Sequence, residues 1–143
     1  MTDASVAVFA PAPVLTVTIE PGHEHAEVHV HAGGQGAWIA HMLGVLDVHT
    51  VLCAPLGGEI GVVLSRVLHT SDLEIRSVST GTNGCFVEDR RSGELESLAH
   101  MPATSLNRHE SDELCNQVIT AGMETRVVVL TGPAGTPTVD PDV

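Results

Sequence analysis

The 143-residue sequence predicts one α/β domain, built on a mostly parallel sheet with flanking helices. Three observations lead to this prediction. Short apolar runs alternate with stretches of helical periodicity, glycine-rich turns separate the two, and 43% of the residues are hydrophobic. We expect a single core rather than two independent domains at this length.

The N-terminal part predicts a leader and two strands. Residues 1–13 hold Pro11 and Pro13 and no basic segment, so we expect a disordered leader rather than a signal helix. Val14–Ile19 is β-branched and mostly apolar, which is typical of a first core strand covered on both faces. Ala26–His31 alternates apolar and polar residues, and this favours a half-exposed strand outside the main core.

Two glycine-rich segments each predict the start of a helix. The run Gly33-Gly34-Gln35-Gly36 precedes apolar residues at helical spacing, which we expect to face the core. These residues are Trp38, Ile39, Met42, Leu43 and Leu46. Thr50–Ala54 is a second apolar strand, and Gly57-Gly58 introduces a helix with Leu64 on its apolar stripe. This order of strand, helix and strand is typical of a parallel sheet.

The next segments predict an edge strand and a hairpin. Leu73–Ser77 alternates as an edge strand does. Cys85–Glu88 and Glu94–Leu98 flank a turn at Arg90-Arg91-Ser92-Gly93, and this arrangement indicates a β-hairpin.

The C-terminal part predicts a helix and a strand. Asn107 and Glu110 have the spacing of a capping box, and Leu114, Val118 and Ile119 are expected to face inward before Gly122 ends the helix. Val127–Leu130 is expected to be the last buried strand. The tail from Gly132 to Val143 holds three prolines, and we expect the domain to be truncated there.

The charge balance excludes several classes of function. The chain has 18 acidic and six basic residues, and all six basic ones are arginine, which gives a formal net charge of −12. This charge repels phosphate backbones and anionic lipid, so we expect no binding to nucleic acid or membranes. Without lysine, the chain can have neither a P-loop lysine nor a Schiff-base lysine.

The cysteines and the hydropathy indicate a soluble protein of the cytoplasm. Cys53, Cys85 and Cys115 are odd in number and form no CxxC pair, which argues against a disulfide framework or a zinc knuckle. No uninterrupted apolar stretch approaches the roughly 18 residues of a membrane span.

Several motifs recur in the order of a known family. Thr16-Val17-Thr18-Ile19-Glu20-Pro21 resembles a T-L-N-P opening strand, and Ala32-Gly33-Gly34-Gln35-Gly36-Ala37-Trp38-Ile39-Ala40 resembles A-G-G-K-G-x-N-x-A. Thr80-Gly81-Thr82-Asn83 resembles T-R-x-N, Met101-Pro102-Ala103 resembles M-P-G, and Val128-Val129-Leu130-Thr131-Gly132 resembles V-L-S-G. From Val14 to Val139 the chain is thus similar to the N-terminal half of a ribokinase-like PfkB carbohydrate kinase, closest to the phosphofructokinase branch for hexose phosphates.

This resemblance implies phosphoryl transfer from ATP with Mg²⁺ to a sugar or sugar phosphate, which lies between an α/β core and a small β lid. The implied substrate-binding residues are Glu24, Gly33, Gly34, Gln35, Trp38 and Asn83. Gln35 and Trp38 replace a lysine and an asparagine of the family motif, and Glu24 replaces an aspartate. An indole lacks the paired donor and acceptor of an amide, so these replacements weaken the implied sugar site.

The resemblance also implies an incomplete kinase. The G-A-G-D segment with the catalytic base and the anion hole is absent, as is the nucleotide-binding half, so residues 14–143 are expected to be inactive alone. The connection from Glu24 to Gly33 is short, which predicts a reduced lid. We expect self-association through this lid or through an exposed sheet edge.

Other interpretations stay open. The chain is alternatively a non-catalytic, degenerate module that binds a sugar or a partner. On one strand, His23, His25, His29 and His31 would share a face with Glu27, as a metal surface requires, although a solvent-facing polar strand is the favoured interpretation. The glycine run is not G-x-G-x-x-G, which disfavours a dinucleotide site, and no G-x-S-x-G motif is present.

Two further candidate sites are expected to have a structural role and not a functional one. Asp89-Arg90-Arg91 is expected to be a solvated hairpin tip rather than a phosphate clamp. Cys53, on an apolar strand, is expected to be a core residue rather than a nucleophile.

Overall fold

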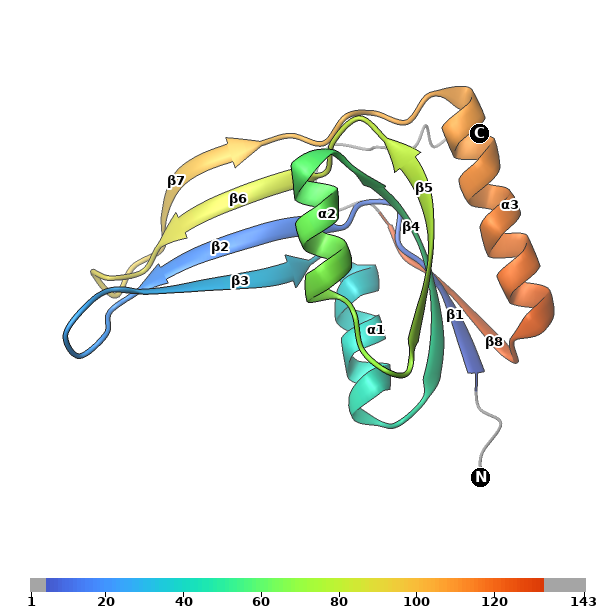
Figure 1. The fold of residues 1–143 in the computed structure, drawn as a ribbon, viewed down its shortest axis with the longest axis horizontal. Helices are drawn as coiled ribbons and strands as arrows, with labels where there is room; N and C mark the ends of the chain where they lie inside the picture. The colour runs from blue at the N-terminus through green and yellow to red at the C-terminus, as the bar shows by residue number, and fades with distance from the viewer. Residues whose placement is uncertain (1–4, 133–143) are drawn as a thin grey trace.

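The computed structural model describes residues 5–132, which form two four-stranded sheets and three helices (Figure 1). Sheet A is wholly parallel, in the order β5 (Leu73–Thr80), β4 (His49–Gly57), β1 (Ser5–Phe9) and β8 (Val127–Leu130). Sheet B has the order β3 (Glu27–Gly33), β2 (Val14–Glu20), β6 (Gly84–Asp89) and β7 (Glu96–Met101). The mostly parallel α/β architecture predicted from the sequence is therefore confirmed.

Helices cover both faces of sheet A. Helices α1 (Gln35–Val45) and α2 (Gly58–Val67) lie on one face, and α3 (Arg108–Glu124) lies on the other. The apolar side chains of β1 alternate between the two cores, because Val8 packs with the α1 side and Ala7 with the α3 side.

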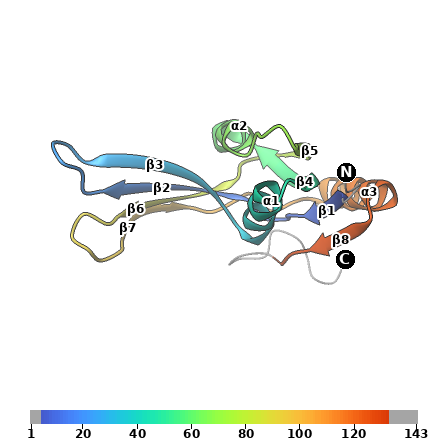
Figure 2. The same ribbon diagram turned by 90° about the horizontal axis from the view of Figure 1, so that it is seen from below.

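Sheet B extends away from this three-layer core as a long arm (Figures 1 and 2). Its register places mostly polar side chains on one face, where Thr18 pairs with His29 and with Glu88. The opposite face is apolar, with Val17 between Val30 and Val87. Sheet B joins the core near the carboxyl ends of the strands of sheet A, which is the position predicted for the β lid.

The expected disordered leader is wrong for residues 5–13. Ser5–Phe9 forms β1, the strand between β4 and β8, and Ala7 and Val8 are fully buried. Residues 1–4 lie outside the described part. Pro11 and Pro13 follow β1 in the connection to β2, where a missing N–H does not interrupt a ladder. Proline therefore marks the end of a strand here and not the absence of one.

The predicted strand at Val14–Ile19 exists as β2, but it belongs to sheet B and not to the core sheet. Its β-branched residues are not all apolar, because Thr16 and Thr18 lie on the polar face of sheet B and alternate with Leu15, Val17 and Ile19. The reduced lid is also wrong, because β2 pairs with β3 along its whole length and with β6, which gives four strands.

Helix burial differs from the predicted stripes. Helix α1 packs through the small residues Gly36, Ala37 and Ala40, whereas Trp38 is 63% exposed. Met42 and Leu46 are exposed as well, while Ile39 and Leu43 pack against the core as expected. Trp38 and Met42 thus point outward, because only small side chains fit where α1 comes closest to β1.

The structure of α3 and β8 also differs from the prediction. Helix α3 continues past Gly122 to Glu124, and a Cβ at Gly122 would lie 3.0 Å from Val128 Cγ2, so this glycine permits close packing and does not cap the helix. Ile119 is exposed, and β8 is an exposed edge strand instead of a buried one.

The capping box and the hairpin, which were predicted from short sequence motifs, are both confirmed. Asn107 Oδ1 accepts the amide hydrogen of Glu110 at 2.9 Å, and Glu110 Oε2 accepts that of Asn107 at 2.8 Å, which confirms the capping box. Strands β6 and β7 form the predicted antiparallel hairpin. Within residues 5–132, each helix is too short or too polar to cross a lipid bilayer.

Candidate functional site

The carboxyl ends of the parallel strands bring several connections together. Ala10 follows β1, Gly57 ends β4 and Thr131 follows β8, while α1 and α2 both begin at this end of the sheet. Ligands of open α/β sheets bind outside the carboxyl ends of the strands. This end, which faces the junction with sheet B, is therefore the candidate site.

The glycine run fits the first turn of α1 tightly against the connection from β1 to β2. Gly34 has a φ of +98°, and a Cβ there would lie 2.8 Å from the carbonyl oxygen of Ala12. At Gly36 a Cβ would lie 2.3 Å from the Cβ of Ala10 and 3.3 Å from Thr131 Oγ1. Any larger residue at either position would push the helix away from the sheet.

The start of α1 has no side-chain cap. Gly34 accepts the amide hydrogen of Trp38 at 3.0 Å, and Gln35 is exposed beside it. The amides of a first helical turn attract an anion or a hydroxyl oxygen. The segment Gly34–Gly36 can therefore contribute backbone donors to a ligand.

Asn83 ties three segments together and is only 2% exposed. Its Nδ2 donates to the carbonyl oxygens of Pro55 at 2.9 Å and Pro13 at 3.3 Å. Its Oδ1 accepts the amide hydrogen of Gly57 at 2.9 Å, and its own amide donates to the carbonyl of Gly57 at 3.3 Å. Both amide hydrogens of the side chain are thus used within the protein, so Asn83 positions the site rather than contacting a ligand.

Hydrogen bonds also fix the connection from β5 to β6, which is the second connection between the two sheets. Thr104 donates its amide hydrogen to the carbonyl of Thr82 at 2.9 Å, and Thr104 Oγ1 accepts that of Thr82 at 3.1 Å. Gly58 has a φ of +64°, and a Cβ there would meet Thr82 Oγ1 at 3.0 Å. The start of α2 is therefore packed against the segment that leads into sheet B.

Trp38 faces a groove of about 690 Å³ between α1 and the end of α2. His41 and Val45 on α1, Val30 on β3 and Asp72 before β5 also line it. Gly33, Gly34 and Gln35 do not line this groove. The indole thus lies one turn along the helix from the glycine run, with one side open to solvent.

Glu24 lies apart from the other implied substrate residues. It is exposed in the turn between β2 and β3, and all of β3 separates it from Gly34. Seven strand residues span roughly 20 Å. The structure thus groups Gly33, Gly34, Gln35 and Asn83 around the Ala12–Pro13 connection, and leaves Glu24 at the far tip of the arm.

The histidine run forms no metal site. Only His29 and His31 lie on β3, with His29 Nε2 3.3 Å from Glu27 Oε2 and the two rings stacked at 6.2 Å. His23 and His25 lie in the preceding turn. Among residues 5–132, no group of three or more histidine, cysteine, aspartate or glutamate side chains is placed to hold a metal ion.

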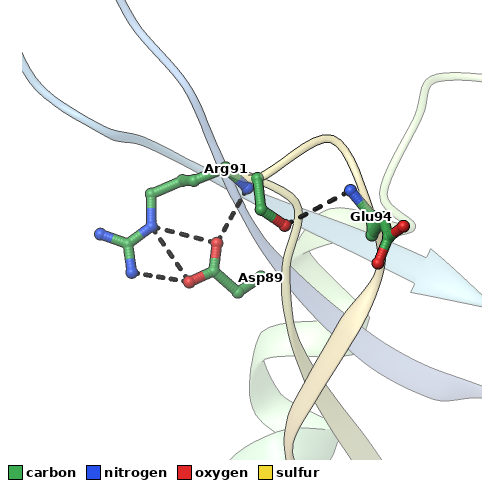
Figure 3. Close-up of polar contacts among 4 residues, drawn as sticks. Asp89, Arg91 and Glu94 are labelled. Carbon is green, nitrogen blue, oxygen red and sulfur yellow. Dashed lines mark hydrogen bonds and ion pairs between the residues drawn. The ribbon is translucent and has the colours of Figure 1, made fainter.

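The hairpin tip binds its own arginine (Figure 3). Asp89 Oδ1 accepts from the amide and Nε of Arg91 at 2.9 and 3.0 Å, and Oδ2 accepts from Nη2 at 2.6 Å. These hydrogen bonds from Arg91 lower the pKa of Asp89. The guanidinium is therefore engaged at the tip, as the structural interpretation expected.

Two of the three thiols, those of Cys53 and Cys85, are poor nucleophiles. Cys53 is fully buried in β4, and burial raises its pKa, which confirms the core interpretation. Burial raises the pKa of Cys85 as well. Both side chains stay protonated at neutral pH and lack the thiolate that nucleophilic catalysis needs.

The connection Ala10–Pro13, which contacts both the glycine run and Asn83, was not predicted from the sequence. A signal was available in the uninterrupted apolar run Val6–Ala10, which is long enough for a buried strand. Thr131, whose Oγ1 donates to the carbonyl of Phe9 at 2.6 Å, was included only as part of a motif.

No protein-family model and no curated protein sequence matches this chain. Solved structures do match its fold. A possible 1-phosphofructokinase from Thermotoga maritima matches 95% of the chain with a TM-score of 0.78 at 15% identity, and the match covers 47% of that protein. Phosphofructokinase-2 from Escherichia coli in complex with fructose-6-phosphate matches 93% of the chain with a TM-score of 0.70 at 23% identity, again over 47% of its length.

A more distant match is a candidate ribokinase from Agrobacterium tumefaciens, with a TM-score of 0.50 and 15% identity over 70% of this chain and 36% of its own. The Escherichia coli phosphofructokinase-2 also has a structure in a tetrameric inhibited form. This chain spans about half the length of the phosphofructokinases that it matches. The described residues therefore share the fold of about half of these phosphofructokinases.

Proposed function

We propose that this chain is the sugar-binding half of a ribokinase-like kinase that phosphorylates a hexose phosphate, such as a fructose phosphate. The observation that carries this proposal is the match along nearly the whole chain to phosphofructokinases, one of them in complex with fructose-6-phosphate. The free state of all three cysteines supports a reducing compartment such as the cytoplasm.

The proposed place for the sugar phosphate is the carboxyl end of sheet A, beside the start of α1. The uncapped first turn offers amide hydrogens there, and the helix dipole favours an anion. A Cβ at Gly33 would lie 3.4 Å from Thr16 Oγ1, so the polar face of sheet B lies next to this turn. Hydroxyl and imidazole groups on that face, at Thr16 and His31, suit a polyhydroxyl ligand.

ATP and Mg²⁺, which a kinase of this fold uses, do not fit the described residues. No acidic or histidine cluster within residues 5–132 is placed for a metal ion. Three of the six arginines are already paired with carboxylates, because Arg76 binds Glu74 and Glu124, Arg90 binds Glu88 and Arg91 binds Asp89. We therefore place the metal outside residues 5–132, and we propose no nucleotide-binding residue among them.

The first experiment tests catalysis. A coupled assay of ADP release, with fructose phosphates, tagatose phosphate or ribose as acceptor, is expected to detect no turnover by this chain, because phosphoryl transfer needs charge stabilisation that these residues do not supply. Turnover above that of boiled protein would contradict the proposal that this half of the kinase binds the sugar without catalysing phosphoryl transfer.

The second experiment tests binding. We expect fructose 6-phosphate and fructose 1-phosphate to bind with a millimolar dissociation constant in an NMR titration, and fructose to bind more weakly. A charge-assisted hydrogen bond contributes about 1.5–3 kcal/mol, so the loss of two such contacts, those of the motif lysine and asparagine, moves a micromolar site to roughly the millimolar range.

Restoring the motif residues makes this test sharper. The double variant Gln35→Lys, Trp38→Asn changes two exposed positions, and we expect it to bind either fructose phosphate at least about tenfold more tightly. Val45→Asn, exposed at the other end of α1, is the matched control and should bind as the wild type does. No resonance shift in either protein at roughly 10 mM ligand would instead favour the non-catalytic partner-binding module.

A further inference from the structure

The groove between α1 and the end of α2 combines an aromatic side chain with several polar ones. Its volume of about 690 Å³ lies within the range of roughly 300–1,000 Å³ that is typical of small-molecule sites. Trp38 lines it from α1 and is 63% exposed, and His41 follows one turn later. Thr70, Ser71 and Asp72, which precede β5, line it from a separate segment. We call this the Trp38 groove, and its polar side chains come from two different parts of the fold.

The Trp38 groove lies away from β8. Val30 on β3, Ala37 and Ala40 on α1 and Leu68 after α2 provide its apolar surface, and the last three are buried. Its remaining wall is the segment that leads into β5, which is the edge strand of sheet A farthest from β8. No residue of β1 or β8 lines the groove, so a segment that follows β8 is not needed to form it.

The carboxylate of Asp72 is available to a ligand. Its Oδ2 accepts from Ser71 Oγ at 3.1 Å, and no arginine or histidine among residues 5–132 forms an ion pair with it. A carboxylate oxygen only accepts hydrogen bonds, and those that it accepts from hydroxyl groups are stronger than bonds between neutral groups. The charge of Asp72 and the net charge of −12 also repel an anion. A neutral ligand with several hydroxyl groups therefore suits this groove.

We propose that the Trp38 groove binds an uncharged sugar, with the sugar ring against the indole and its hydroxyl groups on Asp72 and His41. One face of a sugar ring presents C–H groups with a small positive charge, and these pack against the negative face of an aromatic ring. The hydroxyl groups at the rim of the ring need the donors and acceptors that the imidazole and the carboxylate offer. Gly33, Gly34 and Gln35 do not line the groove, so this site is separate from the proposed sugar-phosphate site.

The fluorescence of Trp38 tests the proposal, because the chain has one tryptophan and no tyrosine. D-glucose, D-fructose and maltose are each titrated to roughly 100 mM, and at least one is expected to bind with a millimolar dissociation constant. Binding should shift the emission to the blue, because the sugar displaces water from the indole. Fructose 6-phosphate should bind in this groove more weakly than fructose, because the carboxylate of Asp72 repels its phosphate.

Two variants change the groove and keep the fluorophore. Gly44 lines the groove, and a Cβ there has nothing within 4 Å, so the side chain of Gly44→Leu would occupy the space of the sugar. Asp72→Asn removes the charge and keeps the size of the side chain. Each should weaken binding at least about tenfold. Asp47→Asn is the matched control, because Asp47 is also exposed but does not line the groove, and asparagine tolerates its φ of +55°. This control should bind as the wild type does.

Far-UV circular dichroism confirms that each variant is folded. An emission that stays unchanged with all three uncharged sugars would overturn the proposal. So would a shift that Gly44→Leu and Asp72→Asn both retain, or one that Asp47→Asn abolishes while Asp72→Asn does not. The proposal is also wrong if fructose 6-phosphate causes as large a shift as fructose in the part of the signal that Gly44→Leu removes. The amide resonances of Gly34–Gly36 report the sugar-phosphate site in a separate NMR titration, so either site can fail without the other.

Discussion

Replacing Asn83 with alanine tests whether this side chain holds the junction of the two sheets. The substitution removes three hydrogen bonds at once, two to the carbonyl oxygens of Pro13 and Pro55 and one from the amide of Gly57. Each of these backbone groups would then lack its partner in a region where Asn83 itself is buried. The connection into β2, the end of β4 and the start of α2 would lose their common contact.

The expected loss of stability follows from these contacts. An unsatisfied buried donor or acceptor costs about 1–3 kcal/mol, so three such groups, partly rescued by water, cost about 3–5 kcal/mol. Total stabilities of single domains lie near 5–15 kcal/mol, so the variant should be close to unfolding. In urea, with a typical slope of about 2 kcal/mol per M, the midpoint should fall by roughly 2 M.

Two measurements check this prediction. Urea unfolding followed by far-UV circular dichroism gives the change in the free energy of unfolding, and hydrogen exchange reports the amide of Gly57, which should lose protection in Asn83→Ala. Asn107→Ala is the matched control. It removes an exposed N-cap, should cost about 1 kcal/mol and should leave the amide of Gly57 protected.

Asn83→Asp distinguishes a polar junction from simple packing. The carboxylate keeps an acceptor for Gly57 but presents negative oxygens to the carbonyls of Pro13 and Pro55, so its pKa should rise. A raised pKa of an acid means that the folded state binds the proton more tightly, so this variant should gain stability as the pH falls. The reasoning is wrong if Asn83→Ala loses less than about 1 kcal/mol, or loses no more than Asn107→Ala.

Two further predictions concern α1 and the hairpin tip. Gly36→Val should lose about 1–3 kcal/mol in thermal unfolding, because its Cβ would collide with that of Ala10, whereas Gly44→Ala in the same helix has nothing within 4 Å and should gain about 0.5–1 kcal/mol. Equal effects at both glycines would contradict this packing argument. In an NMR titration, the pKa of Asp89 should lie below its usual value of about 4 and return toward it in Arg91→Gln, because Arg91 stabilises the carboxylate. The contribution of this contact to stability is present above pH 4 or so and is lost as the pH falls through the lowered pKa; an unchanged pKa in the variant would refute it.

Local features of this fold could be predicted from the sequence, because their causes are local. The capping box at Asn107 needs only Glu110 three residues later, and the β6–β7 hairpin needs only a turn between two short strands. Both are present in the structure. Membership of a strand in one sheet or the other depends instead on partners far along the chain, such as the pairing of Phe9 with Leu130.

The burial of α1 shows a second limit of sequence reasoning. A helix that approaches a sheet closely buries its small residues, and here Gly36, Ala37 and Ala40 form the contact face. The hydrophobic pattern gives most weight to large side chains, and Trp38 and Met42 therefore suggested the wrong face. Which face is buried follows from how closely the helix must approach β1, and that distance is a property of the assembled layers.

The candidate site is constrained by the same packing. Gly34 and Gly36 are required by the contacts with Ala12 and Ala10 whether or not a ligand binds, so a glycine run in this place is explained by the fold alone. Gln35 and Trp38 are different, because both are exposed and no core contact selects them. Substitutions at these two positions can therefore change sugar binding without disturbing the core, whereas substitutions at the glycines would report on folding instead.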